Sequence, residues 1–308
     1  MRRILHTALV LAAAPALVLA GAGLASSAGA TSVATASAAT TWAPAATAAI
    51  HPGVETFTGR AQCTANFVFT NGTNVYIGQA AHCSGTGTTT DTNGCTSPTL
   101  PVGTPVTISG AAHQGVMVYN SWATMQDLHE TNPNICQYND LALVQVNPAD
   151  VGTVNPTIPV WGGPDGLDTT GAPTGSLVYS YGNSILRLGI TALSPKFGLS
   201  EGDTGGGWGH SVQTITPGIP GDSGSAFLDA HGNALGILST FTVGLPRGVV
   251  NTVGDLALEL AYMHSHTSFS AVRLVPGTSA FDPFTLPLNL AQPIDPNAVT
   301  NLKTFLGL

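Results

Sequence analysis

Apolar residues along the chain occur in short runs that polar and turn-forming residues interrupt. The segment Val75–Ala80 has an alternating pattern and leads into Ala81 and His82, and Leu141–Val146 is a mostly apolar run. Alternation and short apolar runs are typical of β-strands. The 37 glycines and 21 prolines are accompanied by many Thr, Ser and Asn residues. Because these residues favour turns, the pattern predicts an all-β protein and argues against a helical bundle.

One segment near the C-terminus has the period of a helix. Residues 254–264 place apolar side chains at helical spacing, with Asp255 near the start: Leu256, Leu260 and Met263. This spacing predicts a short amphipathic helix. Residues 265–308 contain five prolines among isolated apolar residues. Proline interrupts regular structure, so we expect an extended C-terminal tail there.

The N-terminus has the order of an export signal. Arg2 and Arg3 precede an apolar stretch at 4–24, and an Ala-x-Ala pattern follows at 28–30. We therefore expect residues 1–30 to be a signal peptide that is removed, which predicts a secreted, extracellular protein. A membrane-anchoring helix is the alternative, because the stretch is long, but Pro15 and the many alanines favour cleavage.

A linker and a charge deficit complete the outline. Residues 31–49 are rich in Ala and Thr without periodicity, which is typical of a linker or short propeptide. The chain has 308 residues, only 8% of them charged, and a net charge of -8. Nucleic-acid binding needs a basic surface, so this charge excludes a nucleic-acid partner. We expect a monomer with no membrane association once the signal is removed.

The four cysteines fit an oxidising compartment. They are Cys63, Cys83, Cys95 and Cys136, and four cysteines allow three pairings. The spacing contains no C-x-x-C pair, so we predict neither a metal nor another cofactor. The residues alone leave the disulfide pairing open.

Three polar residues stand in settings suited to catalysis. His82 follows two small residues at the end of a predicted strand, Asp140 directly precedes another, and Ser223 lies between glycines in the run 220–225. Taken singly, each has a plain structural interpretation, as a surface histidine or as turn residues. Together they supply what acyl transfer requires: a hydroxyl nucleophile, a base to take its proton and a carboxylate to orient that base.

The order of these residues along the chain selects a family. The order is His, Asp, Ser, which differs from that of the α/β-hydrolases and subtilisins, and the G-x-S-x-G elbow is absent because Ser225 stands in its last position. With the motifs Ala-Ala-His-Cys, Asn-Asp-Leu-Ala-Leu and Gly-Asp-Ser-Gly, residues 50–264 resemble a trypsin-like (chymotrypsin-fold) serine protease of the bacterial secreted type. A weaker match is Gly-Ile-Leu-Ser at 236–239.

The resemblance implies a fold and a reaction. The fold is two six-stranded antiparallel β-barrels, at about 50–150 and 160–253, with the active site between them, followed by the short helix and the tail. The function is a secreted serine endopeptidase that hydrolyses protein or peptide substrates through an acyl-enzyme. Ser223 is the implied nucleophile, His82 the base and then acid, and Asp140 the residue that orients His82.

Further roles also follow only from the resemblance. The backbone N–H groups of Gly221 and Ser223 would form the oxyanion hole. Cys63 and Cys83 would be the pair that braces the histidine loop, which leaves Cys95 for Cys136. Pro220, directly before Gly221, restricts the backbone next to this hole.

Substrate specificity is expected to be uncharged or apolar. Pro217 stands six residues before the nucleophile, where trypsin-like enzymes place an acidic residue, so cleavage after Lys or Arg is not predicted. Ser239, Thr240 and Phe241 would form another wall of the substrate pocket. A contact of His210 with an acidic substrate side chain is the alternative.

Two further questions stay open. In zymogens of this family a freed N-terminus pairs with the acid before the serine, here Asp222. Ile50 could supply such a terminus, or Arg60 or Arg187 could pair with the carboxylate from within the chain. The function also has alternatives: an inactive protease-like binding or structural protein, or an esterase of the Gly-Asp-Ser type, although such esterases carry the serine near the mature N-terminus.

Overall fold

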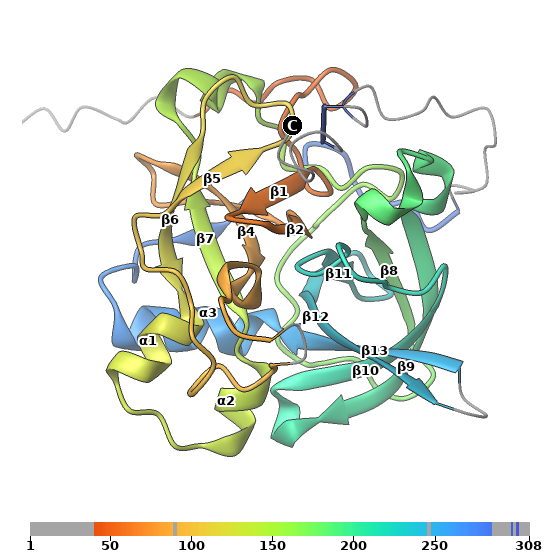
Figure 1. Ribbon diagram of the computed structural model, residues 1–308. Coiled ribbons are helices and arrows are strands. Elements are labelled where there is room, and N and C mark those ends of the chain that lie inside the picture. Colours follow the sequence, from red (N-terminus) through yellow and green to blue (C-terminus); the bar gives the residue numbers. More distant parts are fainter. Residues whose placement is uncertain (1–39, 89–90, 245–247, 285–296, 298–299, 302–308) are drawn as a thin grey trace, which may run out of the picture. The chain divides into compact units, whose positions relative to one another are not determined.

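Antiparallel strands dominate the computed structural model of the chain (Figure 1). It describes residues 40–88, 91–244, 248–284, 297 and 300–301. The expected signal peptide at 1–30, part of the linker and much of the expected tail lie outside the described residues. The described residues all belong to one compact unit that begins at Ser37.

The first sheet closes on itself through a broken strand. It has eight strands in the order β14-β3-β4-β7-β6-β5-β1-β2. Only residues 65–67 separate β2 from β3, and hydrogen bonds from Asn66 N–H to the Gly78 carbonyl and from Gly78 N–H to the Phe67 carbonyl tie that break to β4. Counted as one strand, β2 and β3 link β1 to β4 and complete a six-stranded barrel. The strands are β1 (Glu55–Thr58), β2 (Ala61–Thr64), β3 (Val68–Thr70), β4 (Val75–Ala80), β5 (Pro105–Ile108), β6 (Gly115–Asn120), β7 (Leu141–Gln145) and β14 (Arg273–Leu274).

The second sheet is a closed barrel in the order β10-β13-β12-β11-β8-β9. In Figure 1 it lies beside the first sheet. The predicted all-β architecture of two antiparallel barrels is thereby confirmed. The strands are β8 (Leu177–Tyr181), β9 (Pro195–Thr204), β10 (Gly209–Ile215), β11 (Ala226–Leu228), β12 (Ala234–Gly244) and β13 (Gly248–Asp255).

The predicted C-terminal helix is present as α3 (Leu256–His266). The Asp255 side chain caps it by accepting a 2.8 Å hydrogen bond from the Leu258 N–H. After α3 the chain turns at residues 268–271, and β14 then pairs with β3 on the first sheet. No helix in the described part of the chain combines the length and apolarity that a membrane span requires.

The sequence pattern did not predict the other helices. Two short α-helices stand between β6 and β7, and each begins with a capping asparagine, Asn120 or Asn132. Both are too short to show helical periodicity. The helices are α1 (Ser121–Asp127) and α2 (Pro133–Tyr138), with 3₁₀ turns η1 (Ala81–Ser84), η2 (Pro148–Thr153), η3 (Ile185–Arg187), η4 (Thr191–Leu193) and η5 (Gly205–Gly207).

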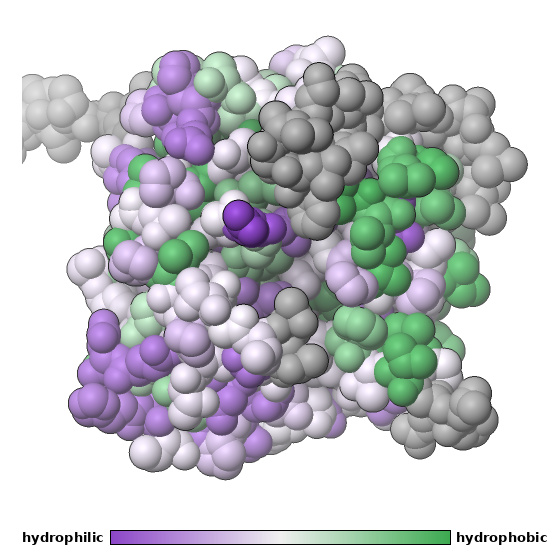
Figure 2. All heavy atoms as spheres, in the orientation of Figure 1, coloured by the Kyte–Doolittle hydropathy of each residue, from purple (hydrophilic) through white to green (hydrophobic). Residues whose placement is uncertain are grey.

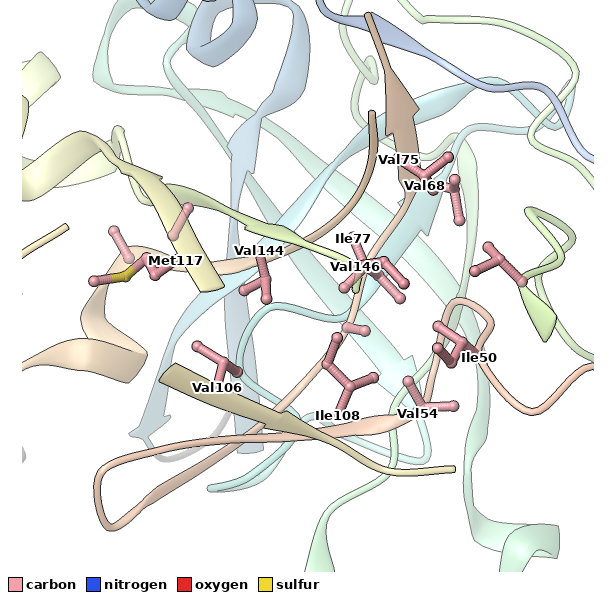
Figure 3. Packing of buried hydrophobic residues seen from close by; sticks show 14 of the residues in the cluster. Ile50, Val54, Val68, Val75, Ile77, Val106, Ile108, Met117, Val144 and Val146 are labelled. Atoms are coloured by element: carbon pink, nitrogen blue, oxygen red, sulfur yellow. The ribbon is translucent and has the colours of Figure 1, made fainter. Parts of the chain in front are cut away.

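The first barrel is filled by aliphatic side chains from its strands. Figure 3 shows Ile77 and Val144, from neighbouring strands, among them, with Met117 nearby. A second core cluster joins β7 to α3 and to the second barrel. This packing fixes the first residues of β7, and Asp140 directly precedes them.

Two disulfides are present, in the pairing that the resemblance implies. Cys63–Cys83 joins β2 to the turn η1, and Cys95–Cys136 joins a loop to α2. The first bridge ties Cys83, which follows His82 in η1, to β2 of the first barrel. We expect it to restrict movement of His82, which is next to Cys83.

Candidate active site

Strand pairing brings His82 and Asp140 together. β4 and β7 are antiparallel neighbours, and Ala80 at the end of β4 pairs with Leu141 at the start of β7. His82 is two residues after Ala80, and Asp140 is one residue before Leu141. Nδ1 of His82 lies 2.6 Å from Oδ2 of Asp140, and the His82 N–H donates to Oδ1 at 2.9 Å.

The Asp140 carboxylate binds a second side chain besides that of His82. The residue is buried (2% exposed), and the Ser239 hydroxyl donates a further 2.6 Å hydrogen bond to Oδ2. Burial alone would lower the pKa of His82, but the Asp140 charge and hydrogen bond outweigh it, so the pKa of His82 is raised. With Nδ1–H donated to Asp140, the neutral imidazole of His82 keeps its lone pair on Nε2.

Ser223 lies on a tight turn between β10 and β11. Its neighbours Gly221 and Gly224 have φ of +94° and +86°, a conformation that favours glycine. A Cβ on Gly224 would stand 2.6 Å from the Thr64 carbonyl oxygen, which shows that the turn packs directly against the first barrel. The Thr64 N–H also donates to the Ser223 carbonyl at 2.8 Å.

His82 and Ser223 line one cleft of about 700 Å³. Its walls come from both barrels. The first barrel supplies Gln62 and Trp122, and the second supplies Ile185, Leu186 and Phe241, among others. A ligand bound in this cleft would therefore contact both catalytic candidates.

Two backbone N–H groups in the serine turn are left without an acceptor. The N–H groups of Asp222, Gly224 and Ser225 donate to carbonyls of the protein. Among the described residues, the N–H groups of Gly221 and Ser223 donate to none. The Gly221 carbonyl is bound by the Gln62 amide at 3.0 Å and by the Thr64 hydroxyl at 2.8 Å, which fixes the turn. Paired free donors of this kind suit a developing oxyanion.

Asp222 pairs with cations from within the chain. Nη2 of Arg187 lies 2.6 Å from its Oδ2, and Nζ of Lys196 lies 3.1 Å from the same oxygen. The Ile50 N–H instead donates to the Thr153 carbonyl at 3.2 Å. Of the partners considered from sequence, Arg187 is thus the one found.

Lys196 is a second partner of Asp222 that sequence reasoning missed. It is fully buried in β9 (0% exposed). Burial lowers its pKa to about 8, although Asp222 opposes this effect. A lysine in a strand of mixed polarity is ordinarily exposed, so no signal in the sequence marks it.

The predicted pocket residues divide into two groups. Thr240 and Phe241 line the cleft, as does Ser239, whose hydroxyl is bonded to Asp140. Pro217 is not among the cleft residues, and its carbonyl accepts from Nη2 of Arg187 at 3.0 Å. Behind it the Asn251 amide binds both the N–H and the carbonyl of Gly218, at 2.8 and 3.2 Å.

His210 lies away from the cleft. It is fully buried, with Nδ1 2.8 Å from Oδ1 of Asp203 and Nε2 3.0 Å from Oδ2 of Asp255. Burial lowers its pKa, but the two carboxylates outweigh this and raise it. Both ring nitrogens are occupied, so His210 offers no group to an acidic substrate side chain.

One cluster has the composition of a metal site. Cys63, His82 and Cys83 place potential ligand atoms within 4.8 Å of one another. Both sulfurs belong to the same disulfide, so they are not thiolates. This cluster does not fit a metal ion.

Comparison with known proteins finds similar solved structures. Protease A of Thermobifida fusca is 17% identical, with 74% of this chain and 99% of that chain covered and a TM-score of 0.48. A glutamic-acid-specific serine protease that uses a histidine triad in substrate binding is 18% identical (73% and 100% covered, TM-score 0.46). A chymotrypsin of Cellulomonas bogoriensis is 17% identical (73% and 98% covered, TM-score 0.43). By name these are proteases. No protein-family model and no curated protein matches the chain.

Proposed function

We propose that the protein is a secreted serine endopeptidase with Ser223 as nucleophile. One observation carries the proposal: His82, hydrogen-bonded through Nδ1 to the buried Asp140, lines the same cleft as Ser223. The two free N–H groups of the serine turn support it. A base with an oriented imidazole, a hydroxyl and paired donors are the parts that acyl transfer needs.

In the first half of the reaction, Oγ of Ser223 forms a bond to the carbonyl carbon of the scissile peptide, and its proton passes to Nε2 of His82. The carbonyl oxygen becomes an oxyanion that the N–H groups of Gly221 and Ser223 bind. The C–N bond then breaks, and His82 returns the proton to the leaving amine.

In the second half, water replaces the amine. His82 takes a proton from the water as its oxygen attacks the ester carbon, and returns the proton to Oγ of Ser223 when the C–O bond breaks. The Asp140 carboxylate keeps its hydrogen bond to Nδ1 and stabilises the imidazolium that forms twice in the cycle. The Ser239 hydroxyl helps to hold that carboxylate in place.

The cleft favours substrates with uncharged or apolar side chains over Lys and Arg. Leu186 and Phe241 line it and are 59% and 47% exposed. In Figure 2 apolar surface is concentrated on the side of the second barrel, which supplies both residues. Pro217 lies outside the cleft, and Asp91, the acidic residue that lines it, already accepts hydrogen bonds from the N–H and the hydroxyl of Thr88, at 2.9 and 2.7 Å. Protein or peptide segments with apolar residues therefore fit best.

Secretion belongs to the same proposal. The two disulfides are stable in an oxidising compartment, and residues 1–30 have the order of a signal peptide. The protein would act outside the cell as a monomer.

The test is digestion of casein by the purified mature protein over a range of pH. We expect cleavage whose rate falls at acid pH, because protonated His82 cannot accept a proton. Since Asp140 raises the pKa of His82, the fall should be centred above 6.5, the ordinary value. Intact casein at every pH would contradict the proposal, and so would a rate that does not fall on acidification.

A further inference from the structure

One buried carboxyl group beside Asp140 takes no part in the steps above. Glu259 lies in α3 and is 0% exposed. Fully buried glutamates are rare, because a carboxyl group loses its hydration in the interior. The other residues on this buried side of α3 are mainly apolar: Leu256, Leu260, Tyr262 and Met263. Burial of an apolar side chain at position 259 would cost less free energy than burial of a carboxyl group. We therefore looked for a function of this carboxyl group.

Glu259 contacts the backbone of Asp140. Its Oε1 accepts a 2.7 Å hydrogen bond from the Asp140 N–H. The Asp140 carboxylate is bound by His82 and Ser239, and the Asp140 carbonyl accepts from the Ala81 N–H. Of these contacts, the one from Glu259 ties Asp140 to α3.

The support behind Glu259 is firm. Three apolar residues of α3 share a core cluster with Leu141 and Leu143 of β7, the strand that begins directly after Asp140: they are Leu256, Leu260 and Met263. The backbone of Gly254 approaches so closely that a Cβ there would stand 2.7 Å from Oε1 of Glu259. Oε1 therefore has little freedom to move away from the Asp140 N–H.

The charges around Glu259 favour its neutral form. Burial raises its pKa well above the usual range, and the carboxylates of Asp140 and Asp255 add to this, although the hydrogen bond from Asp140 opposes it. Tyr119, from β6, is a further titratable group that interacts with Glu259. No cation among the described residues forms an ion pair with Glu259.

We propose that Glu259 is a positioning residue whose buried carboxyl oxygen holds the backbone of Asp140, so that the Asp140 carboxylate stays aligned with Nδ1 of His82. The consequence for catalysis rests on the proposed function. The effect on the hydrogen bond between His82 and Asp140 does not depend on that function, because it concerns only the geometry of these two side chains. Loss of the Glu259 contact lets Asp140 relax and weakens its hydrogen bond to His82.

The test is an NMR titration of His82, read in the Ser223→Ala background so that self-cleavage cannot interfere. Asp140 raises the pKa of His82, so Glu259→Leu should lower that pKa by about one unit. Glu259→Gln keeps a neutral oxygen acceptor of the same reach and should titrate like the parent. Glu259→Asp withdraws the oxygen by the length of one methylene and should shift the pKa of His82 in the same direction as Glu259→Leu. It replaces Glu259→Leu in the test if Glu259→Leu does not fold.

Kinetics and stability supply the second readout. With Ser223 intact, Glu259→Leu should lower kcat by about tenfold to a hundredfold with little change in KM, since a small misplacement near the reacting groups costs this much. Its stability to urea should stay close to that of the wild type, because removal of a buried acid offsets the loss of the hydrogen bond from the Asp140 N–H. If Glu259 served only to stabilise the fold, Glu259→Leu would lose activity only to the extent that it loses stability.

Glu130 provides a matched control. Its Oε2 accepts a 3.3 Å hydrogen bond from the Tyr262 hydroxyl, so it contacts α3 but not Asp140. Glu130→Leu and Glu130→Gln should leave the titration of His82 unchanged. Wild-type titration of His82 in both Glu259→Leu and Glu259→Asp would overturn the proposal, as would a Glu259→Gln variant that titrates like Glu259→Leu. If the protein cleaves no peptide, the titration still decides this question.

Discussion

Replacing Ser223 with alanine is expected to lower kcat for peptide hydrolysis by about a millionfold, and His82→Ala should lower it by a similar factor. The reason is that the two side chains work as a unit. Without Oγ no acyl-enzyme forms, and without Nε2 no group takes the proton from Oγ at neutral pH. The measurement is kcat on a peptide that contains a bond cut in casein.

The non-additivity of the two substitutions makes this prediction specific. The double variant should be no slower than either single variant, because each alone already stops the shared step. Ser225→Ala is the matched control. It also removes a hydroxyl from the serine turn, but that hydroxyl donates to the Asp222 carbonyl, and kcat should stay within about tenfold of the wild type. Multiplicative losses in the double variant would contradict the assignment of a shared step.

The second large effect is on stability. Asp222→Asn should lower the free energy of unfolding by about 3–5 kcal/mol, because it leaves two buried cations, Arg187 and Lys196, without their carboxylate. Asp222 also accepts from the N–H groups of Ser184 and Ile219, both at 3.0 Å. Urea denaturation at neutral pH measures the change.

Lys196→Met is the control for this substitution. It leaves the Arg187–Asp222 pair intact and removes a charge whose burial is costly, so its stability should differ little from that of the wild type. The pKa of Lys196 falls from 10.5 to about 8 on folding, so the unfolded chain binds more protons between these values. This group therefore makes the wild type more stable as pH rises from about 8 towards 10.5, a rise absent in Lys196→Met. Equal stability of Asp222→Asn and Lys196→Met would contradict the account of this cluster.

The strands and the nucleophile turn could be anticipated because their signals are local. Alternation marks β4, the apolar run marks β7, and glycine on both sides marks the turn at Ser223. Only the family resemblance implied that His82 and Asp140 meet, and their meeting depends on the pairing of Ala80 with Leu141. Local pattern thus predicts the elements, while the site depends on long-range register.

The buried charges could not be anticipated. Lys196 and Glu259 lie in elements where a charged residue ordinarily faces solvent. In the interior each one binds a group from a distant part of the chain, which local sequence does not reveal. Lys196 binds Asp222, and Glu259 binds the backbone of Asp140. Pro217 shows the same limit, since its spacing to Ser223 does not reveal that its carbonyl binds Arg187 and that it lies outside the cleft.

Labelling with a fluorophosphonate tests the central claim, that Ser223 is an activated nucleophile, without any choice of peptide. The folded mature protein should react at one site, which mass spectrometry of the digested product should map to Ser223. Labelling should disappear in His82→Ala, which retains the hydroxyl but lacks the base. An unlabelled Ser223 in folded protein, free of any attached propeptide, would contradict the account and favour a protease-like binding protein instead.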